Sequence, residues 1–375
     1  MRAFFSSGDV GGARAILPVI EKCLENGLEI IVLDHGHISK EMPSHWERIK
    51  PDKMNSQILA KNFCYEFNIR TFIFSSSLKD PTPLTLARNL KELHVPVIHV
   101  LDNWTSYRSR METDGLSAFR PDYYAVMDDI AYEEAKAEGI EESTLITTGH
   151  PALSSLPNEY QKWKREHSRD FIKQYGFDPQ KKLVTFVSEP VEQDQGASCE
   201  ISTYRGYTEK VVLRNLCEAI QQFSESIQVL LLPHPREETR GLKNIWNECK
   251  GRIQGNVILF EKGRDGIFLS DGIAGMASLL LYEAWLLGKS VISLQPGVRQ
   301  KSLRMLQKRE NLVFVDSYSE IRFSITHWLN GILMGISYPV RPEMKDHENA
   351  PSTIFNLIRE QISLNSGRNC FKGEI

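Results

Sequence analysis

The chain has 375 residues, of which 41% are hydrophobic and 25% are charged, and its formal net charge at pH 7 is -3. This length suits two domains of ordinary size, and the balanced charge gives no basic excess for binding nucleic acid. The six cysteines lack paired metal-ligand spacing, so we expect reduced thiols and neither a zinc site nor a disulfide framework. No signal peptide or long apolar run is recognised, which favours a cytoplasmic protein and leaves peripheral membrane association open.

The N-terminal half alternates short apolar runs with amphipathic segments, which predicts parallel strands joined by helices. A first strand over Arg2–Phe5 leads into a turn with three glycines, Gly8, Gly11 and Gly12. A glycine-rich turn between a first strand and a first helix is the layout of a nucleotide-binding fold. The spacing differs from GxGxxG, so the turn does not indicate a dinucleotide, and such glycines also serve simply to allow a tight turn.

The most apolar predicted strand of this half covers Val95–Leu101, and Asp102 follows its carboxyl end. Ligands of open parallel sheets bind at this edge, so Asp102 is a candidate catalytic residue. The alternative is that Asp102 caps its loop and pairs with Arg108. An earlier predicted strand, Thr71–Phe74, is followed by Asp80 just before the next predicted helix.

A strongly charged segment at 158–169 separates two halves that share the same alternation of strands and helices. We therefore predict an α/β fold with two Rossmann-like, doubly wound parallel-sheet domains that face a cleft. The expected boundaries are 1–155 for the N-terminal domain, 156–348 for the C-terminal domain, and 349–375 for a last crossing helix and a polar tail.

In the second half, a predicted strand over Ile227–Leu232 ends in Pro233-His234-Pro235-Arg236-Glu237. An imidazole and a guanidinium at a strand's carboxyl end are natural partners of phosphate, the arginine through a bidentate fork. We therefore treat His234 and Arg236 as substrate-binding candidates, with a structural histidine as the alternative.

Residues 269–297 carry the strongest indication of chemistry. A short apolar run at Gly266–Leu269 predicts a strand, and a loop and a helix over Leu279–Leu287 follow. Gly288 ends that helix, and Val291–Leu294 is a buried strand.

The start of this helix favours an anion, because its first N–H groups lack partners and the helix dipole is positive there. Ser278 lies at the expected N-cap, and small residues before it, among them Gly275, let a phosphate approach the backbone. Glu283, about one and a half turns along the helix, could reach a ribose hydroxyl. The alternative is that Ser278 only caps the helix and that Glu283 is a solvated acid.

This stretch resembles the C-terminal nucleotide-binding segment of GT-B glycosyltransferases and of the related UDP-N-acetylglucosamine 2-epimerases through Asp271, Ser278, Tyr282-Glu283-Ala284 and Leu287-Gly288-Lys289-Ser290. In those families an acidic residue, a Gly/Ser turn and a Glu-containing segment hold the donor's phosphates and ribose. The chain departs from the epimerase pattern by a longer interval between Asp271 and Glu283 and by Ser290 in place of proline. The spacing is closer to polymer-type transferases, such as teichoic-acid glycerophosphotransferases and bacterial sialyltransferases.

Other segments carry the same resemblance. In an epimerase-like alignment Asp80 matches one acid and Asp102 falls beside a second, and the His-Pro pair at His234 is similar to that of capsule and teichoic-acid transferases. In GT-B proteins the loop matching Asp9 and Gly11 faces the acceptor. The catalytic candidates are thus Asp9, Asp80 and Asp102, with a turn-forming role as the alternative for Asp9. The substrate-binding candidates are His234, Arg236, Ser278, Glu283, Gly275 and Gly11.

The resemblance implies a GT-B fold and, as the leading hypothesis, a glycosyltransferase of polysaccharide biosynthesis with no cofactor. No DxD motif is placed to hold a metal, so we expect this transferase to be metal-independent. Its partners would be a nucleotide-sugar donor and a glycan or lipid-linked acceptor. A UDP-sugar 2-epimerase or nucleotide-sugar hydrolase is the first alternative, and a non-catalytic nucleotide-sugar-binding protein is the second. A homodimer is left open.

Overall fold

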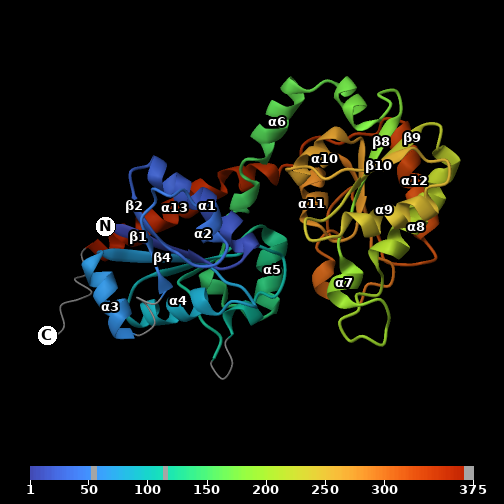
Figure 1. The fold of residues 1–375 in the computed structure, drawn as a ribbon. Coiled ribbons are helices and arrows are strands. Elements are labelled where there is room, and N and C mark those ends of the chain that lie inside the picture. The colour runs from blue at the N-terminus through green and yellow to red at the C-terminus, as the bar shows by residue number, and fades with distance from the viewer. Residues whose placement is uncertain (52–56, 113–116, 367–375) are drawn as a thin grey trace. The chain divides into compact units, whose positions relative to one another are not determined.

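The computed structural model describes residues 1–51, 57–112 and 117–366. The chain divides into two compact units, and Figure 1 labels the helices and strands of each. Unit 1 consists of Met1–Ser155 and Lys345–Ile375, and unit 2 consists of Leu156–Met344. The tail at 367–375, for which a polar character was expected, lies outside the described residues.

Unit 1 contains a seven-stranded parallel sheet in the order β3-β2-β1-β4-β5-β6-β7. Its strands are β1 Arg2–Ser7, β2 Glu29–Leu33, β3 Arg48–Ile49, β4 Ile69–Ser75, β5 Val97–Val100, β6 Tyr123–Val126 and β7 Leu145–Thr147. Its helices include α1 Val10–Glu25, α2 Ile38–Glu41, α3 Gln57–Glu66, α4 Thr82–Glu92, α5 Asp129–Ala137 and, from Lys345 onward, α13 Met344–Ser366.

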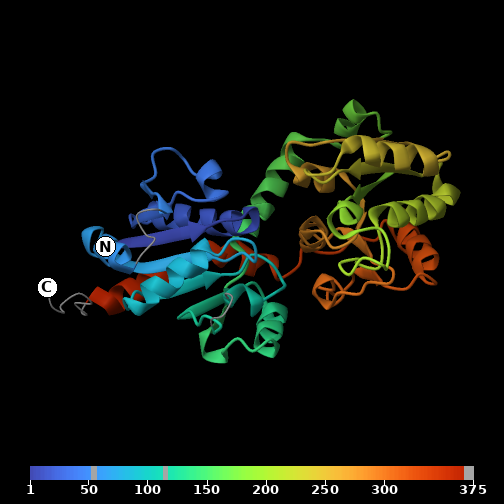
Figure 2. The same ribbon diagram turned by 60° about the horizontal axis from the view of Figure 1, so that its bottom comes forward.

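The last helix belongs to the core of unit 1, although it is far from the other elements in sequence. Ile354 and Ile358 of α13 are fully buried in one cluster with Ile16 and Ile20 of α1. Figure 2 shows α13, in red, running along this unit. Burying these aliphatic side chains supplies the main driving force for docking the helix.

Unit 2 contains a six-stranded parallel sheet in the order β10-β9-β8-β11-β12-β13. Its strands are β8 Lys182–Val187, β9 Ile227–Leu232, β10 Gly255–Val257, β11 Gly272–Gly275, β12 Ser290–Leu294 and β13 Val313–Val315. Its helices include α6 Leu156–Glu166, α7 Val191–Gln195, α8 Glu209–Ile220, α9 Thr239–Cys249, α10 Gly263–Leu269, α11 Leu279–Leu286 and α12 Ile321–Leu333.

The central strands of unit 2 are rich in apolar residues because they lie in its core. Every residue of β9 and of β12 is buried, as expected for parallel strands covered on both faces. Leu213 and Leu216 of α8 and Ile325 and Leu329 of α12 are buried in the same hydrophobic cluster.

The predicted α/β class with two doubly wound parallel sheets is confirmed. None of the described helices is long and apolar enough to span a bilayer.

One predicted strand was wrong. The apolar run Gly266–Leu269 lies in α10, and the strand β11 comes later, at Gly272–Gly275. A run of four apolar residues fits a buried helix turn as well as a buried strand, so its periodicity could not decide. The following helix does begin after Ser278 as predicted, and Gly288 follows its C-terminal end with a φ of +75°.

Candidate functional site

In unit 1, the candidate residues gather where the strand order reverses. The chain proceeds from β1 outward to β2 and β3, and then returns to β4 on the other side of β1. The loops after β1 and β4 therefore diverge at their carboxyl ends, which is where open α/β sheets bind ligands. Asp9 follows β1, Asp80 follows β4, and Asp102 follows the neighbouring β5.

The structure brings Asp80 against the glycine-rich turn. A Cβ atom built on Gly8 would lie 1.5 Å from Oδ2 of Asp80, so only glycine allows this approach. The same Oδ2 lies 2.8 Å from Nε2 of His35, which follows β2. The side chains of His35 and Asp80 are 27% and 21% exposed. They form a partly buried imidazole–carboxylate pair, the arrangement in which a carboxylate orients a histidine for proton transfer.

Asp102 occupies the neighbouring position. It forms an ion pair with Arg110, and the two side chains are 7% and 8% exposed. Burial raises the pKa of the Asp102 carboxyl above its ordinary value, and the charge of Arg110 opposes that shift. Arg110 also donates to the carbonyl oxygen of Ser76 at 3.2 Å. The alternative partner expected for Asp102, Arg108, is wrong, because Arg108 pairs with Glu112.

Asp9 has a structural task in addition to its place in the cluster. It is the N-cap of α1, where its Oδ1 accepts a hydrogen bond from the Gly12 N–H at 2.8 Å. The turn-forming role considered for this residue is therefore present. Its second carboxylate oxygen is not needed for the cap.

Among the described residues, no group of three or more His, Cys, Asp or Glu side chains is arranged to hold a metal ion.

Gly11 is expected to be required for the position of Asp102. A Cβ atom at Gly11 would lie 2.3 Å from Oδ2 of Asp102, so Gly11→Ala must displace that buried carboxylate. We expect a loss of about 1–3 kcal/mol in the free energy of unfolding of unit 1, measured by denaturant titration. Gly241→Ala is the matched control, because Gly241 also lies in the first turns of a helix, with open space around its Cβ position. The control should be neutral or slightly stabilising, and an equal loss in both variants would contradict this account.

In unit 2, the corresponding reversal lies between β8 and β11. Ser278 caps α11, and its hydroxyl accepts from the Leu280 N–H at 3.3 Å, as predicted for an N-cap. The N–H of Ala277, just before it, donates to Oε1 of Glu189 at 2.6 Å. The other oxygen of Glu189 pairs with Arg205 at 3.1 Å. A carboxylate of the chain itself thus lies at the anion-favouring end of α11.

The loop after β9 presents His234 at the same edge of the sheet. Its Nδ1 accepts from the Arg236 N–H at 3.1 Å, so the neutral ring carries its proton on Nε2. Burial, and secondarily the charge of Arg236, lowers the pKa of His234 and favours that neutral ring. The Arg236 guanidinium is 62% exposed and forks onto Asp194 of α7 at 3.1 and 2.7 Å.

Glu237 fixes the backbone of this loop. Its Oε2 accepts from the N–H of His234 at 3.1 Å, and its Oε1 accepts from the hydroxyl of Ser188 at 2.9 Å. Since Ser188 directly follows β8, these bonds tie together the loops after β8 and β9. They hold the His234 imidazole at the carboxyl edge of the sheet.

Glu283 is engaged inside unit 2. Its side chain is 7% exposed, and both oxygens accept from Arg264 of α10, at 2.9 and 3.1 Å. Arg264 also pairs with Glu159 of α6 at 2.9 Å. The alternative of a solvated acid is wrong, because this carboxylate is buried in an ion-pair network.

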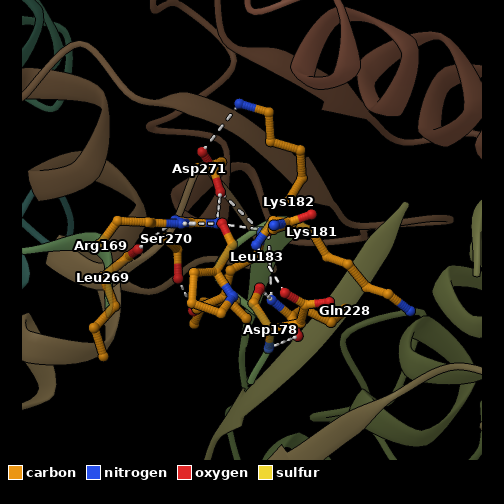
Figure 3. Close-up of polar contacts among 12 residues, drawn as sticks. Arg169, Asp178, Lys181, Lys182, Leu183, Gln228, Leu269, Ser270 and Asp271 are labelled. Atoms are coloured by element: carbon orange, nitrogen blue, oxygen red, sulfur yellow. Dashed lines mark hydrogen bonds and ion pairs between the residues drawn. The ribbon is translucent and has the colours of Figure 1, made fainter. Parts of the chain in front are cut away.

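Asp271 lies at the opposite end of the sheet from the other candidates. It precedes β11, and its Oδ2 accepts from the N–H of Leu183 near the start of β8 at 2.8 Å. Figure 3 shows this carboxylate held by Arg169 at 2.9 Å and by Lys182 at 3.3 Å. The resemblance implies that Asp271 belongs to the nucleotide site. This does not fit its position, because Asp271 lies at the amino ends of the strands.

Gly275 serves packing of the sheet. It is the last residue of β11, and a Cβ atom there would lie 2.8 Å from a side-chain carbon of Leu281 and 2.9 Å from the Val187 carbonyl oxygen. The small residue therefore lets α11 and β8 approach β11.

Sequence reasoning missed Arg110, Glu189 and Arg264. Glu189 could have been found, because the apolar run Leu183–Val187 indicates a strand and Glu189 follows its carboxyl end, as Asp102 follows its own strand. No local pattern indicates the other two, since each finds its acidic partner through the fold.

Comparisons of the whole chain show its fold. No protein-family model and no curated protein sequence matches the chain. Solved structures do match it over nearly their whole length. The UDP-GlcNAc 2-epimerase of Methanocaldococcus jannaschii has 16% identity and a TM-score of 0.66, with 96% of this chain and 100% of that chain covered. The chain has the GT-B-like fold.

Two further structures with this fold hold a nucleotide. The Neisseria meningitidis UDP-GlcNAc 2-epimerase, bound to UDP-GlcNAc, has 12% identity and a TM-score of 0.65, with 96% of this chain and 100% of that one covered. The Anabaena protein HepE in complex with UDP has 13% identity and a TM-score of 0.61, with 97% and 100% covered. The GT-B-like fold expected from the sequence is thus confirmed.

Proposed function

We propose that the protein is an enzyme acting on a UDP-sugar, and that its reaction is epimerisation at C2 of the sugar. The observation that carries the proposal is the gathering of the His35–Asp80 and Asp102–Arg110 pairs at the β1/β4 reversal, where Gly8 and Gly11 leave room for the two carboxylates. The similar structures that hold UDP or UDP-GlcNAc support the choice of substrate class.

The chemistry needs two proton-transfer groups that act on one carbon. A base removes the C2 proton while the C1–oxygen bond to the diphosphate breaks, and UDP then adds back as an acid protonates C2 from the other face. The imidazole of His35, oriented by Asp80, and the carboxylate of Asp102 are the two groups available. A general acid–base group works best when its pKa lies near the working pH, and burial shifts the pKa of the Asp102 carboxyl upward, in that direction.

Unit 2 would hold the nucleotide. The Nε2–H of His234 and the guanidinium of Arg236 suit the phosphates. The start of α11 favours a negative group as well. A phosphate there would exchange with the Glu189 carboxylate, which now accepts from Ala277.

A glycosyltransferase is the second candidate, with transfer to a glycan or lipid-linked acceptor. The His35–Asp80 pair fits this reaction as well, because an imidazole oriented by a carboxylate is suited to deprotonating an acceptor hydroxyl. Such a transfer requires an acceptor, whereas epimerisation does not.

The test is incubation of UDP-GlcNAc with the enzyme in D2O without acceptor, followed by proton NMR. If the enzyme epimerises UDP-GlcNAc, deuterium should replace the proton at C2 and the signals of the 2-epimer should appear beside those of UDP-GlcNAc. Asp80→Asn should abolish the exchange, and Asp129→Asn, which changes an exposed aspartate of α5, should not. If UDP-GlcNAc raises the Tm but C2 never exchanges deuterium, epimerisation is excluded and the transferase becomes the better candidate.

A further inference from the structure

Two cysteines of unit 2 meet at the ends of neighbouring helices. Cys217 lies in the last turn of α8, and Cys249 is the last residue of α9. Their Sγ atoms are 2.9 Å apart, although 32 positions separate them in sequence. Both are free thiols in this structure. This juxtaposition is invisible in the sequence, where the two residues show no paired spacing.

We propose that Cys217 and Cys249 form a reversible intrachain disulfide that ties α8 to α9 when the protein meets a peroxide. Two sulfurs at 2.9 Å need only a small movement to reach the bond length of about 2.05 Å. Both residues lie at helix ends, where side chains and backbone adjust more easily than inside a helix.

The two thiols differ in a way that gives each a role. Cys249 is half-buried, so a small oxidant can reach it, whereas Cys217 is 1% exposed. The hydrogen bond between the thiols lowers the pKa of Cys249 and raises that of Cys217, and Arg214 also favours the Cys249 thiolate. The nucleophile is therefore Cys249, and the resolving thiol is Cys217.

The reaction with hydrogen peroxide balances in two steps. The Cys249 thiolate attacks one peroxide oxygen and breaks the O–O bond, and the departing hydroxide takes up a proton to give a sulfenic acid and water. The sulfur of Cys217 then attacks the sulfenic sulfur, loses its proton and releases a second water. Two thiols are oxidised by two electrons and one peroxide is reduced to two waters, and a dithiol reductant reverses the change.

The other cysteines of the described chain provide internal comparisons. Cys199 is exposed and lies in the loop after α7, so it reports whether oxidant is present in sufficient amount. Burial raises the pKa of Cys23 and of Cys64 to about 12, which should keep both unreactive.

The experiment treats the full chain with a few equivalents of hydrogen peroxide and identifies linked peptides by mass spectrometry without reduction. We expect a Cys217–Cys249 peptide that a dithiol removes, and a rise in Tm of about 5 °C or more, because the bond closes a loop in the unfolded chain. Cys217→Ser and Cys249→Ser should lose both effects, and Cys199→Ser should keep them. If Cys199 becomes oxidised and no Cys217–Cys249 peptide appears, the proposal is wrong. It is equally wrong if the linked peptide forms only in unfolded protein.

Discussion

Replacing Asp102 with asparagine is expected to lower kcat/KM for UDP-GlcNAc by roughly 10²–10⁴-fold, because a general acid–base group is then lost. The substitution keeps the size of the side chain and an oxygen that can accept from Arg110. Arg110 also retains the carbonyl oxygens of Ser76 and Thr105 as partners. The measurement is the rate of C2 deuterium exchange, with the affinity for UDP determined in parallel.

Asp102 also has a structural role, and the assay must separate the two. The asparagine leaves the buried Arg110 without a carboxylate, so the Tm of unit 1 should fall by some degrees. Exchange is therefore compared at a temperature where both proteins are folded by circular dichroism. UDP affinity should stay within a factor of about two, since the proposal places nucleotide contacts in unit 2. A rate that falls only in proportion to the unfolded fraction would make Asp102 purely structural.

Local signals were sufficient for the fold class and for several element ends. The N-cap at Ser278 and the glycine after α11 follow from the chemistry of single residues, because a hydroxyl and a φ of +75° satisfy requirements within one turn. The alternation of buried strands with helices likewise needs only the apolar pattern along the chain. These features could be predicted because nothing distant decides them.

Asp271 shows how a small error in a strand changes a site. With the strand predicted at Gly266–Leu269, Asp271 follows a carboxyl end, where ligands bind. With the strand at Gly272–Gly275, the same residue precedes an amino end, on the opposite edge of the sheet. The sequence contains the residues of the motif. Whether Asp271 lies at the amino or the carboxyl end of a strand depends on which residues form that strand, and the packing of the folded domain decides this.

The partners of buried charged residues likewise could not be predicted from the local sequence. Asp102 has two arginines shortly after it, and the sequence cannot choose between them. The structure selects Arg110, which is buried, while Arg108 is directed to Glu112 at the surface. Arg264 and Glu283 lie on different helices, so only their packing in unit 2 brings them together.

Glu283→Gln is expected to lower the free energy of unfolding of unit 2 by about 3 kcal/mol. The glutamine removes a negative charge that is 7% exposed and that meets Arg264 through both oxygens. Arg264, itself 18% exposed, would lose this carboxylate and keep its ion pair with Glu159. In calorimetry the transition of unit 2 should move down by roughly 6–12 °C, from the usual Tm shift per kcal/mol for a domain of this size.

The matched control is Glu248→Gln, which removes the same charge from an ion pair with Arg214 whose side chains are 61% and 48% exposed. Exposed pairs of this kind contribute at most about 1 kcal/mol, so the control should shift the transition by no more than about 4 °C. The pair of variants also tests the ribose-binding role expected for Glu283. If Glu283→Gln keeps the parent Tm and instead loses UDP affinity, the carboxylate serves the ligand and the buried ion pair is dispensable. If the Tm falls and the remaining folded protein binds UDP as the parent does, Glu283 is a structural residue, and contacts to the ribose must come from another side chain.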